Sequence, residues 1–232
     1  MKFYAISDLH ISTNTNKPMD VFGGNWVNYL EKIKYDWQSK VTDEDIVLIG
    51  GDISWAMNIE DAKSDILTFS HLKGKKVLIK GNHDYWWSGI GKVRDMLPEN
   101  FYALQNDCIK FENVIICGSR CWSVPGAPDF SESDNKIYLR EAERLKLSLN
   151  AVNKIRQEND KVIALIHYPP FNVRREDSLF SKLFEENKVD KVIYGHLHGK
   201  DVRADKLVVK NGVEYYLTSC DQVDNKLVEV KL

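Results

Sequence analysis

The chain has 232 residues, of which 43% are hydrophobic and 28% are charged. This is ordinary globular usage, so it excludes a chain that is disordered, collagen-like or a coiled coil as a whole. The 32 basic and 34 acidic residues leave a net charge of −2, whereas binding along a long nucleic acid duplex needs clustered positive charge. The length predicts a single domain over residues 1–232.

The expected elements alternate between short apolar runs and longer amphipathic stretches. In chain order, the expected strands are 2–6, 46–49, 76–79, 114–117, 162–166, 191–194, 207–209, 213–217 and 227–230. Apolar residues at helical spacing predict helices over 26–37, 59–69 and 135–157. The alternation predicts an α/β architecture with helices outside the sheets. Asn211 and Gly212 predict a tight hairpin turn, so a second, more antiparallel sheet is expected from residue 206 onward.

The four cysteines predict reduced core thiols, because the chain is too large and too poor in cysteine for a disulfide scaffold. None of their spacings is the Cys-x2-Cys of a zinc ribbon. The first residues carry no signal peptide, and no apolar run approaches the length of a membrane span. These features predict a cytoplasmic protein that does not contact a membrane.

Five of the six histidines lie at or just beyond the end of an expected strand, beside Asp, Asn or Gly. The strand ends read Ser-Asp-Leu-His at 7–10, Gly-Gly-Asp at 50–52, Gly-Asn-His-Asp at 81–84, His at 167 and Gly-His-Leu-His at 195–198. Each motif alone is weak, since Gly-Asp after a strand usually marks a turn. Ligands of open α/β sheets bind beyond the carboxyl ends of the strands, so the set together predicts a metal site.

In these motifs the chain resembles the calcineurin-like metallophosphoesterases. The resemblance implies an αββα sandwich, in which two mixed sheets pack together between flanking helices. It also implies two divalent metal ions. One metal would be bound by Asp8, His10 and His198, the other by Asn82, His167 and His196, and both by Asp52. His83 would be the catalytic histidine, with Asp84 beside it to orient it.

The chemistry of these residues agrees with the resemblance. Mixed nitrogen and oxygen ligands suit Mn, Fe or Zn better than Ca or Mg. Only Asp8 and Asp52 are anionic, so two dications would leave the site electropositive and able to attract a phosphate. We therefore expect a dinuclear phosphohydrolase in which a hydroxide between the metals attacks in line. His83 could donate a proton to the leaving oxygen or stabilise another phosphoryl oxygen, and the sequence leaves both roles open.

Residues for substrate recognition are expected around the loop 123–133, the one long irregular segment. Arg120 could bind a phosphate group and Trp122 could stack on a base or sugar. A surface arginine and a core tryptophan are the alternative interpretation. The charged clusters at 73–76 and 140–144 are expected to be solvated faces. No catalytic role is expected for His71.

The expected substrate is a small phosphate ester, because the chain has no long insertion that would form a capping domain. Phosphodiesters are slightly favoured over phosphomonoesters, since no cluster of several arginines is evident beside the motifs. Two alternatives remain. A binding or scaffold protein with the same fold would be expected to lack some of the ligands, and all are present. A nuclease acting on long duplexes is disfavoured by the net charge.

Overall fold

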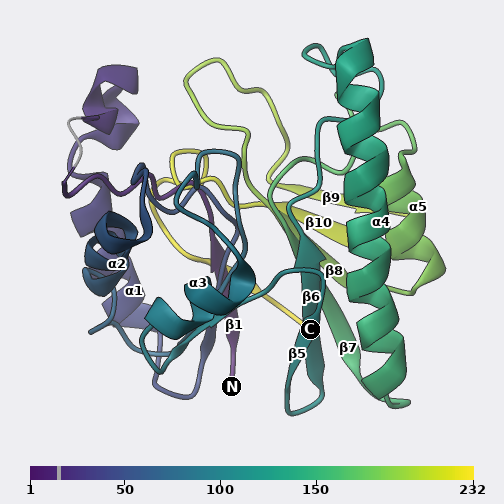
Figure 1. Ribbon diagram of the computed structural model, residues 1–232, viewed down its shortest axis with the longest axis horizontal. Helices are drawn as coiled ribbons and strands as arrows, with labels where there is room; N and C mark the ends of the chain where they lie inside the picture. The colour runs from purple at the N-terminus through teal and green to yellow at the C-terminus, as the bar shows by residue number, and fades with distance from the viewer. Residues whose placement is uncertain (15–16) are drawn as a thin grey trace.

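The computed structural model describes residues 1–14 and 17–232. Two β-sheets pack face to face, and helices cover the outer face of each (Figure 1). The first sheet has the strand order β11-β1-β2-β3-β4. Its strands are β1 (Phe3–Ile6), β2 (Ile46–Ile49), β3 (Lys75–Leu78), β4 (Phe101–Ala103) and β11 (Val228–Val230). Strands β1 to β4 are parallel, and β11 pairs antiparallel with β1.

The second sheet has the order β5-β6-β7-β8-β10-β9. Its strands are β5 (Cys108–Phe111), β6 (Val114–Ser119), β7 (Lys161–Ile166), β8 (Lys191–Tyr194), β9 (Leu207–Lys210) and β10 (Val213–Leu217). The expected hairpin joins β9 and β10, where Asn211 and Gly212 have the positive φ angles that a tight two-residue turn requires. The second sheet is mixed and, as expected, has more antiparallel pairings than the first. Only the edge strands β5 and β9 are antiparallel, and β6, β7, β8 and β10 are parallel.

Five α-helices flank the sheets in the described part of the chain. Helices α1 (Tyr29–Lys40), α2 (Ile59–Leu67) and α3 (Ile90–Met96) cover the first sheet, and α4 (Glu132–Ile155) and α5 (Leu179–Glu186) cover the second (Figure 1). Two short 3-10 helices, η1 (Met19–Phe22) and η2 (Gly24–Trp26), precede α1. The helix expected from residue 26 therefore begins at residue 29, because Asn28 adopts a left-handed conformation that a regular helix does not allow.

An apolar layer between the two sheets holds them together. It includes Leu48 and Val77 from the first sheet and Ile163, Leu165 and Ile193 from the second, all fully buried. The central parallel strands are covered on both faces, which explains why they read as continuous apolar runs rather than alternating ones. The predicted αββα sandwich is confirmed.

The sequence analysis did not predict the strands β4 and β5 or the α-helices α3 and α5. Strand β4 has three residues and β5 is an edge strand whose residues are all partly exposed, so neither carries a strong apolar pattern. Helices α3 and α5 have seven and eight residues, which is too short for helical spacing to be distinctive. In the part of the chain that the structure describes, no helix combines the length and apolar character needed to span a membrane.

Lys76 in β3 makes the stability of this fold depend on pH. The side chain is fully buried, donates a hydrogen bond to the Leu72 carbonyl and lies 5.1 Å from the ring centre of Phe101. Burial lowers the pKa of Lys76 to about 8. An unfolded chain keeps lysine protonated to about pH 10, so between pH 8 and 10 it binds more protons than the folded protein, and stability rises with pH.

We expect the free energy of unfolding to rise by about 2 kcal/mol more in the wild type than in Lys76→Met between pH 7.5 and 9.5. Urea denaturation at each pH measures this difference. Lys63→Met, which changes an exposed lysine on α2, should follow the wild type. Parallel profiles for the wild type and Lys76→Met would show that Lys76 keeps an ordinary pKa.

Candidate metal centre

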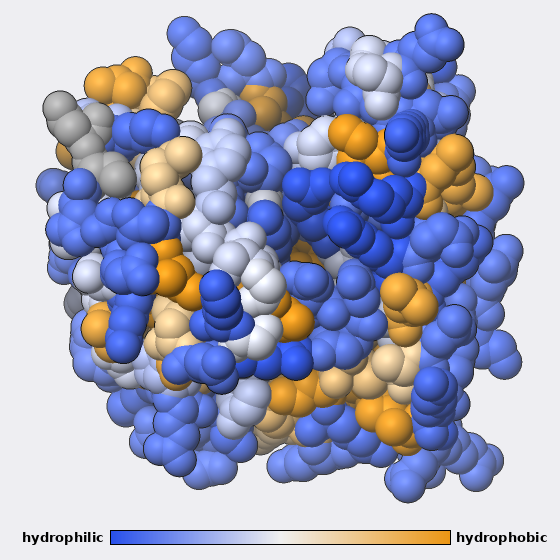
Figure 2. All heavy atoms as spheres, in the orientation of Figure 1, coloured by the Kyte–Doolittle hydropathy of each residue, from blue (hydrophilic) through white to orange (hydrophobic). Residues whose placement is uncertain are grey.

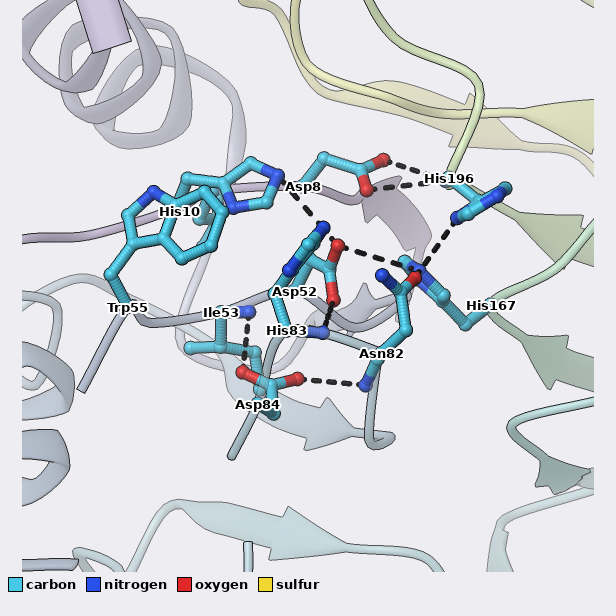
Figure 3. Close-up of polar contacts among 12 residues, drawn as sticks. Asp8, His10, Asp52, Ile53, Trp55, Asn82, His83, Asp84, His167 and His196 are labelled. Atoms are coloured by element: carbon cyan, nitrogen blue, oxygen red, sulfur yellow. Dashed lines mark hydrogen bonds and ion pairs between the residues drawn. The ribbon is translucent and has the colours of Figure 1, made fainter. Parts of the chain in front are cut away.

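The candidate site lies where strands of both sheets end at one edge of the sandwich. Asp8 and His10 follow β1, Asp52 follows β2, and Asn82 follows β3. His167 directly follows β7, and His196 and His198 follow β8. These strands are parallel within each sheet, so their carboxyl ends deliver the loops to the same place. All seven predicted ligands come together there. Figure 3 labels six of them, all except His198.

One group of side chains is formed by Asp8, His10, Asp52 and His198. Each offers one oxygen or nitrogen atom that lies within 4.8 Å of those of the others. Within this group, His10 Nε2 lies 3.7 Å from Asp52 Oδ2. Three of the four residues are buried, and His198 is partly buried. The group includes the three predicted ligands of the first metal together with the predicted bridge.

A second group surrounds the amide of Asn82. The Asn82 Oδ1 atom lies 2.7 Å from His167 Nε2 and 2.9 Å from His196 Nδ1. His167 Nε2 is also 3.5 Å from Asp52 Oδ2, the atom that faces His10 in the first group. Asp52 Oδ2 therefore lies between the two groups, which is the position that a bridging carboxylate requires.

Several buried atoms in this cluster have unused hydrogen-bonding capacity. Both ring nitrogens of His10 and the Oδ2 atom of Asp52 have no hydrogen-bond partner among the described residues. An unsatisfied buried polar group costs about 1–3 kcal/mol, so each needs a compensating contact. A divalent cation would accept a lone pair from one His10 nitrogen and from Asp52 Oδ2, and its charge would offset the carboxylates. The residues thus fit divalent metal ions, and the mixed nitrogen and oxygen donors suit Mn, Fe or Zn.

The backbone at the ligands is strained. Asp8, His10, Asp52 and His196 all have positive φ angles, between 44° and 68°. Such conformations cost about 1–3 kcal/mol each for residues other than glycine and persist only where surrounding contacts hold them. One such contact is the backbone N–H of His196, which donates to Asp8 Oδ2 at 3.0 Å. Strain at four ligands is typical of a site selected for function rather than stability.

Burial determines the protonation of the ligands. It lowers the pKa of His10 well below its usual value and lowers those of His167 and His196 to about 3, so these imidazoles are neutral and can bind a metal. Burial raises the pKa of Asp52 to about 6 and raises that of Asp8 well above its usual value. The Gly50 carbonyl lies 2.9 Å from His167 Nδ1, which directs the other ring nitrogen to the site.

The His83 imidazole lies beside the first group. Its ring is half-buried and packs against Trp55, with ring centres 4.6 Å apart, and lies 5.7 Å from the ring of His10. The His83 backbone N–H donates to Asp52 Oδ1 at 2.8 Å. The predicted catalytic residue is therefore adjacent to the predicted bridge, and its catalytic role stays a prediction.

The expected role of Asp84 needs correction. Its Oδ1 accepts hydrogen bonds from the Ile53 N–H at 2.8 Å and the Trp86 indole at 3.0 Å, and its Oδ2 accepts one from the Gly81 N–H at 2.7 Å. These bonds join the loops after β2 and β3 (Figure 3). Asp84 thus positions the backbone that carries Asp52 and His83 rather than bonding to the His83 ring, because its carboxylate points toward backbone amides.

Arg120 and Trp122 are both attached to α4. The Arg120 guanidinium donates to Glu141 Oε1 at 3.2 Å and lies 4.6 Å from the ring centre of Trp122. The Trp122 indole donates to Asp134 Oδ1 at 2.8 Å. Arg120 is partly buried rather than a surface arginine, whereas Trp122 is partly buried and packs against the core of the second sheet, as the alternative interpretation expected. Their contact with a substrate stays a prediction.

Two aromatic residues at the site were not predicted. Trp55 stacks on His10 with ring centres 4.7 Å apart, and Tyr168 packs on His196 at 4.1 Å. Tyr168 directly follows His167, and Trp55 lies three residues after Asp52. These positions in the sequence indicate that both rings lie near the candidate ligands. The direction in which each ring points depends on the loop conformation, and the sequence does not reveal it.

A cavity of about 380 Å³ adjoins His196. Its walls are largely apolar and include Val124 and Pro128 from the loop 123–133, together with Tyr168, Phe171 and Leu197. A cavity of this size and lining is typical of sites for small organic molecules. The irregular loop expected to aid substrate recognition thus forms one wall beside the candidate metal centre.

A family model of calcineurin-like phosphoesterases matches residues 1–200. The chain belongs to the calcineurin-like phosphoesterase family. Family membership and the cluster of Asp8, His10, Asp52 and His198 together support a metal-dependent phosphohydrolase. No curated protein sequence matches the chain.

Two solved structures show the same fold at low sequence identity. A protein of unknown function from Aquifex aeolicus, AQ665, is similar with a TM-score of 0.52 and 16% identity, over 98% of this chain and 95% of that one. The protein TT1561 of Thermus thermophilus is similar with a TM-score of 0.62 and 11% identity, over 99% of this chain and 97% of that one. At these identities the likeness concerns the fold alone.

Gly81 provides a test of the metal cluster. A Cβ atom at this position would collide with side-chain and backbone atoms of Asp52, so Gly81→Ala must displace the predicted bridge. We expect metal affinity to fall about tenfold or more, measured as metal content after dialysis against a defined concentration of Mn²⁺. Gly89→Ala is the matched control, because a Cβ there meets nothing within 4 Å. Equal metal content in the two variants would contradict the assignment of Asp52.

Proposed function

We propose that the protein is a dinuclear metal-dependent phosphohydrolase that cleaves a phosphodiester or a phosphomonoester. The observation that carries this proposal is the position of Asp52 Oδ2, which lies 3.7 Å from His10 Nε2 and 3.5 Å from His167 Nε2. One carboxylate oxygen therefore contacts both groups of candidate ligands. Asp8, His10 and His198 would hold one metal with it, and Asn82, His167 and His196 the other.

Bound metals at this site would neutralise the phosphoryl oxygens and lower the pKa of the attacking water, so that it reacts in line with the leaving group. The chain supplies the remaining functions. Asp8 and Asp52 balance part of the metal charge, and Asn82 contributes an oxygen without adding negative charge. The half-buried His83 ring, which packs against Trp55 and lies near His10, would donate a proton to the leaving oxygen.

The substrate that we propose is a small phosphate ester. The cavity of about 380 Å³ beside His196 supports this, because it offers an apolar surface for the organic part of such a molecule. The slight preference for a diester depended on the absence of an arginine cluster. The structure brings Arg120, Arg140 and Arg144 together around Glu141, so that reason no longer favours diesters. A comparison of both ester types decides between them.

The alternatives are less well supported. A silent scaffold with this fold has no need for seven convergent ligands and four strained backbone positions. A nuclease would share the metal chemistry, but the net charge of −2 does not favour long duplexes.

We also propose a cytoplasmic location. The four free cysteines agree with a reducing compartment and support this proposal.

The first experiment measures hydrolysis of bis-p-nitrophenyl phosphate and p-nitrophenyl phosphate by protein reconstituted with Mn²⁺. We expect metal-dependent turnover, and we expect Asp52→Asn to lose about 100-fold or more because the variant lacks the bridging charge. Asp95→Asn on α3, an exposed site with the same change of charge, is the control. Turnover that survives in Asp52→Asn would refute the dinuclear mechanism.

A second experiment tests whether His83 donates a proton. Phenolate is a poorer leaving group than p-nitrophenolate, so it depends more on protonation. We expect His83→Ala to reduce kcat about tenfold more for a phenyl ester than for the p-nitrophenyl ester. An equal loss for both esters would indicate that His83 stabilises a different phosphoryl oxygen.

A further inference from the structure

A second cavity of about 340 Å³ lies between the ends of β3, β4 and β6 and the side of α4. Its charged lining consists of Lys80, Arg120, Arg140, Glu141 and Arg144. The remaining lining includes amide and hydroxyl groups, such as those of Gln105, Asn106 and Ser119. Figure 2 shows a strongly hydrophilic patch beside α4 on the corresponding face. We call this cavity the basic pocket.

Arg140 and Arg144 are exposed, as expected for a solvated face, with side chains 56% and 44% exposed. Both also line this pocket with Arg120. The three arginines converge on Glu141, which is 1% exposed. Its Oε1 atom lies 2.7 Å from Arg144 Nη1, 3.2 Å from Arg120 Nη2 and 3.8 Å from Arg140 Nη2. With Lys80, four cations line the pocket against this one carboxylate, so the lining carries a surplus of three positive charges.

This surplus of positive charge is unfavourable for the protein alone. Arg140 and Arg144 lie one turn apart on α4, and like charges at that spacing destabilise a helix. Each guanidinium has five N–H donors in a fork that matches a phosphate, and Glu141 can satisfy only part of them. An anion with two or more charges would offset the repulsion.

Two residues of the basic pocket, Lys80 and Arg120, lie close to candidate metal ligands. The backbone carbonyl of Arg120 accepts the N–H of His167 at 3.2 Å, so one turn carries a pocket arginine and holds a candidate ligand. Lys80 lies two residues before Asn82 in the loop that follows β3.

We propose that the basic pocket binds a second phosphoryl group of the substrate while the reacting phosphoryl group lies at the metal centre. The preferred substrates are then small molecules that carry two phosphoryl groups. This inference rests on the proposed function, because it assumes that the reacting phosphate is bound by the metals. It adds Lys80, Arg140 and Arg144 to Arg120 as residues that determine specificity.

The test measures equilibrium binding to the Mn²⁺-loaded protein by calorimetry. Propyl phosphate is compared with bisphosphates of propane-, pentane- and heptanediol, a series that covers several spans between two phosphates. We expect at least one bisphosphate to bind about tenfold more tightly than propyl phosphate in the wild type. We expect Arg140→Gln/Arg144→Gln to abolish this preference, and Arg144→Gln alone to reduce it.

The matched control is Lys146→Gln/Lys154→Gln, which removes the same number of positive charges from α4 at exposed positions outside the pocket lining. It should retain the preference for the bisphosphate. A preference that persists in the double arginine variant, or that disappears equally in the control, would overturn the proposal. So would equal affinity of the wild type for the monophosphate and every bisphosphate.

Binding of inorganic phosphate distinguishes the two possible occupants of the basic pocket, a phosphoryl group of the substrate and free phosphate. Two phosphates bound per chain, with no preference for any bisphosphate, would indicate a site for free phosphate and overturn the assignment to the substrate. Because this test measures binding rather than turnover, its outcome is independent of the hydrolysis assay. If the wild type prefers a bisphosphate but hydrolyses neither ester, the proposed function is refuted. If it hydrolyses an ester but has no preference for a bisphosphate, only the present inference is refuted.

Discussion

The carboxylate of Asp52 joins the two halves of the candidate site. Its Oδ1 atom accepts the backbone N–H of His83, and its Oδ2 atom lies between His10 and His167. A buried carboxylate is unfavourable without compensating charge, and here burial raises its pKa to about 6. The groups around it come from both sheets, so the spacing of the sheets must be held closely for one side chain to reach both.

The sandwich provides that spacing through its apolar interior. Leu48, Val77 and Ile193 belong to the close-packed layer between the sheets, and such interiors resist small displacements. Above this layer the loops are held by polar contacts. Asp84 joins the loops after β2 and β3 through the N–H groups of Ile53 and Gly81. The strained conformations of the ligands are therefore supported by rigid neighbours, which is the condition under which such strain persists.

Helix α4 connects the candidate metal centre to the distribution of charge around it. The buried Glu141 of this helix forms ion pairs with Arg140 and Arg144, which also lie on α4, and with Arg120, which follows β6. The chain as a whole has a net charge of −2, yet the lining of this pocket is strongly positive. The net charge of a chain thus argues against binding along an extended polyanion but gives no information about a local anion site.

The sequence by itself determined most of the sandwich and the set of candidate ligands. Strands β2, β8 and β10 have the predicted bounds, because buried parallel strands are short, continuous apolar runs with distinct ends. The motifs directly after such strands predicted a metal site, and the resemblance to the calcineurin-like family implied its seven candidate ligands. Only the tertiary structure decided that Asp84 bonds to backbone amides and that Arg120 meets Arg140 and Arg144. These contacts join residues from different elements, so they exist only once β6, α4 and the loops have packed together.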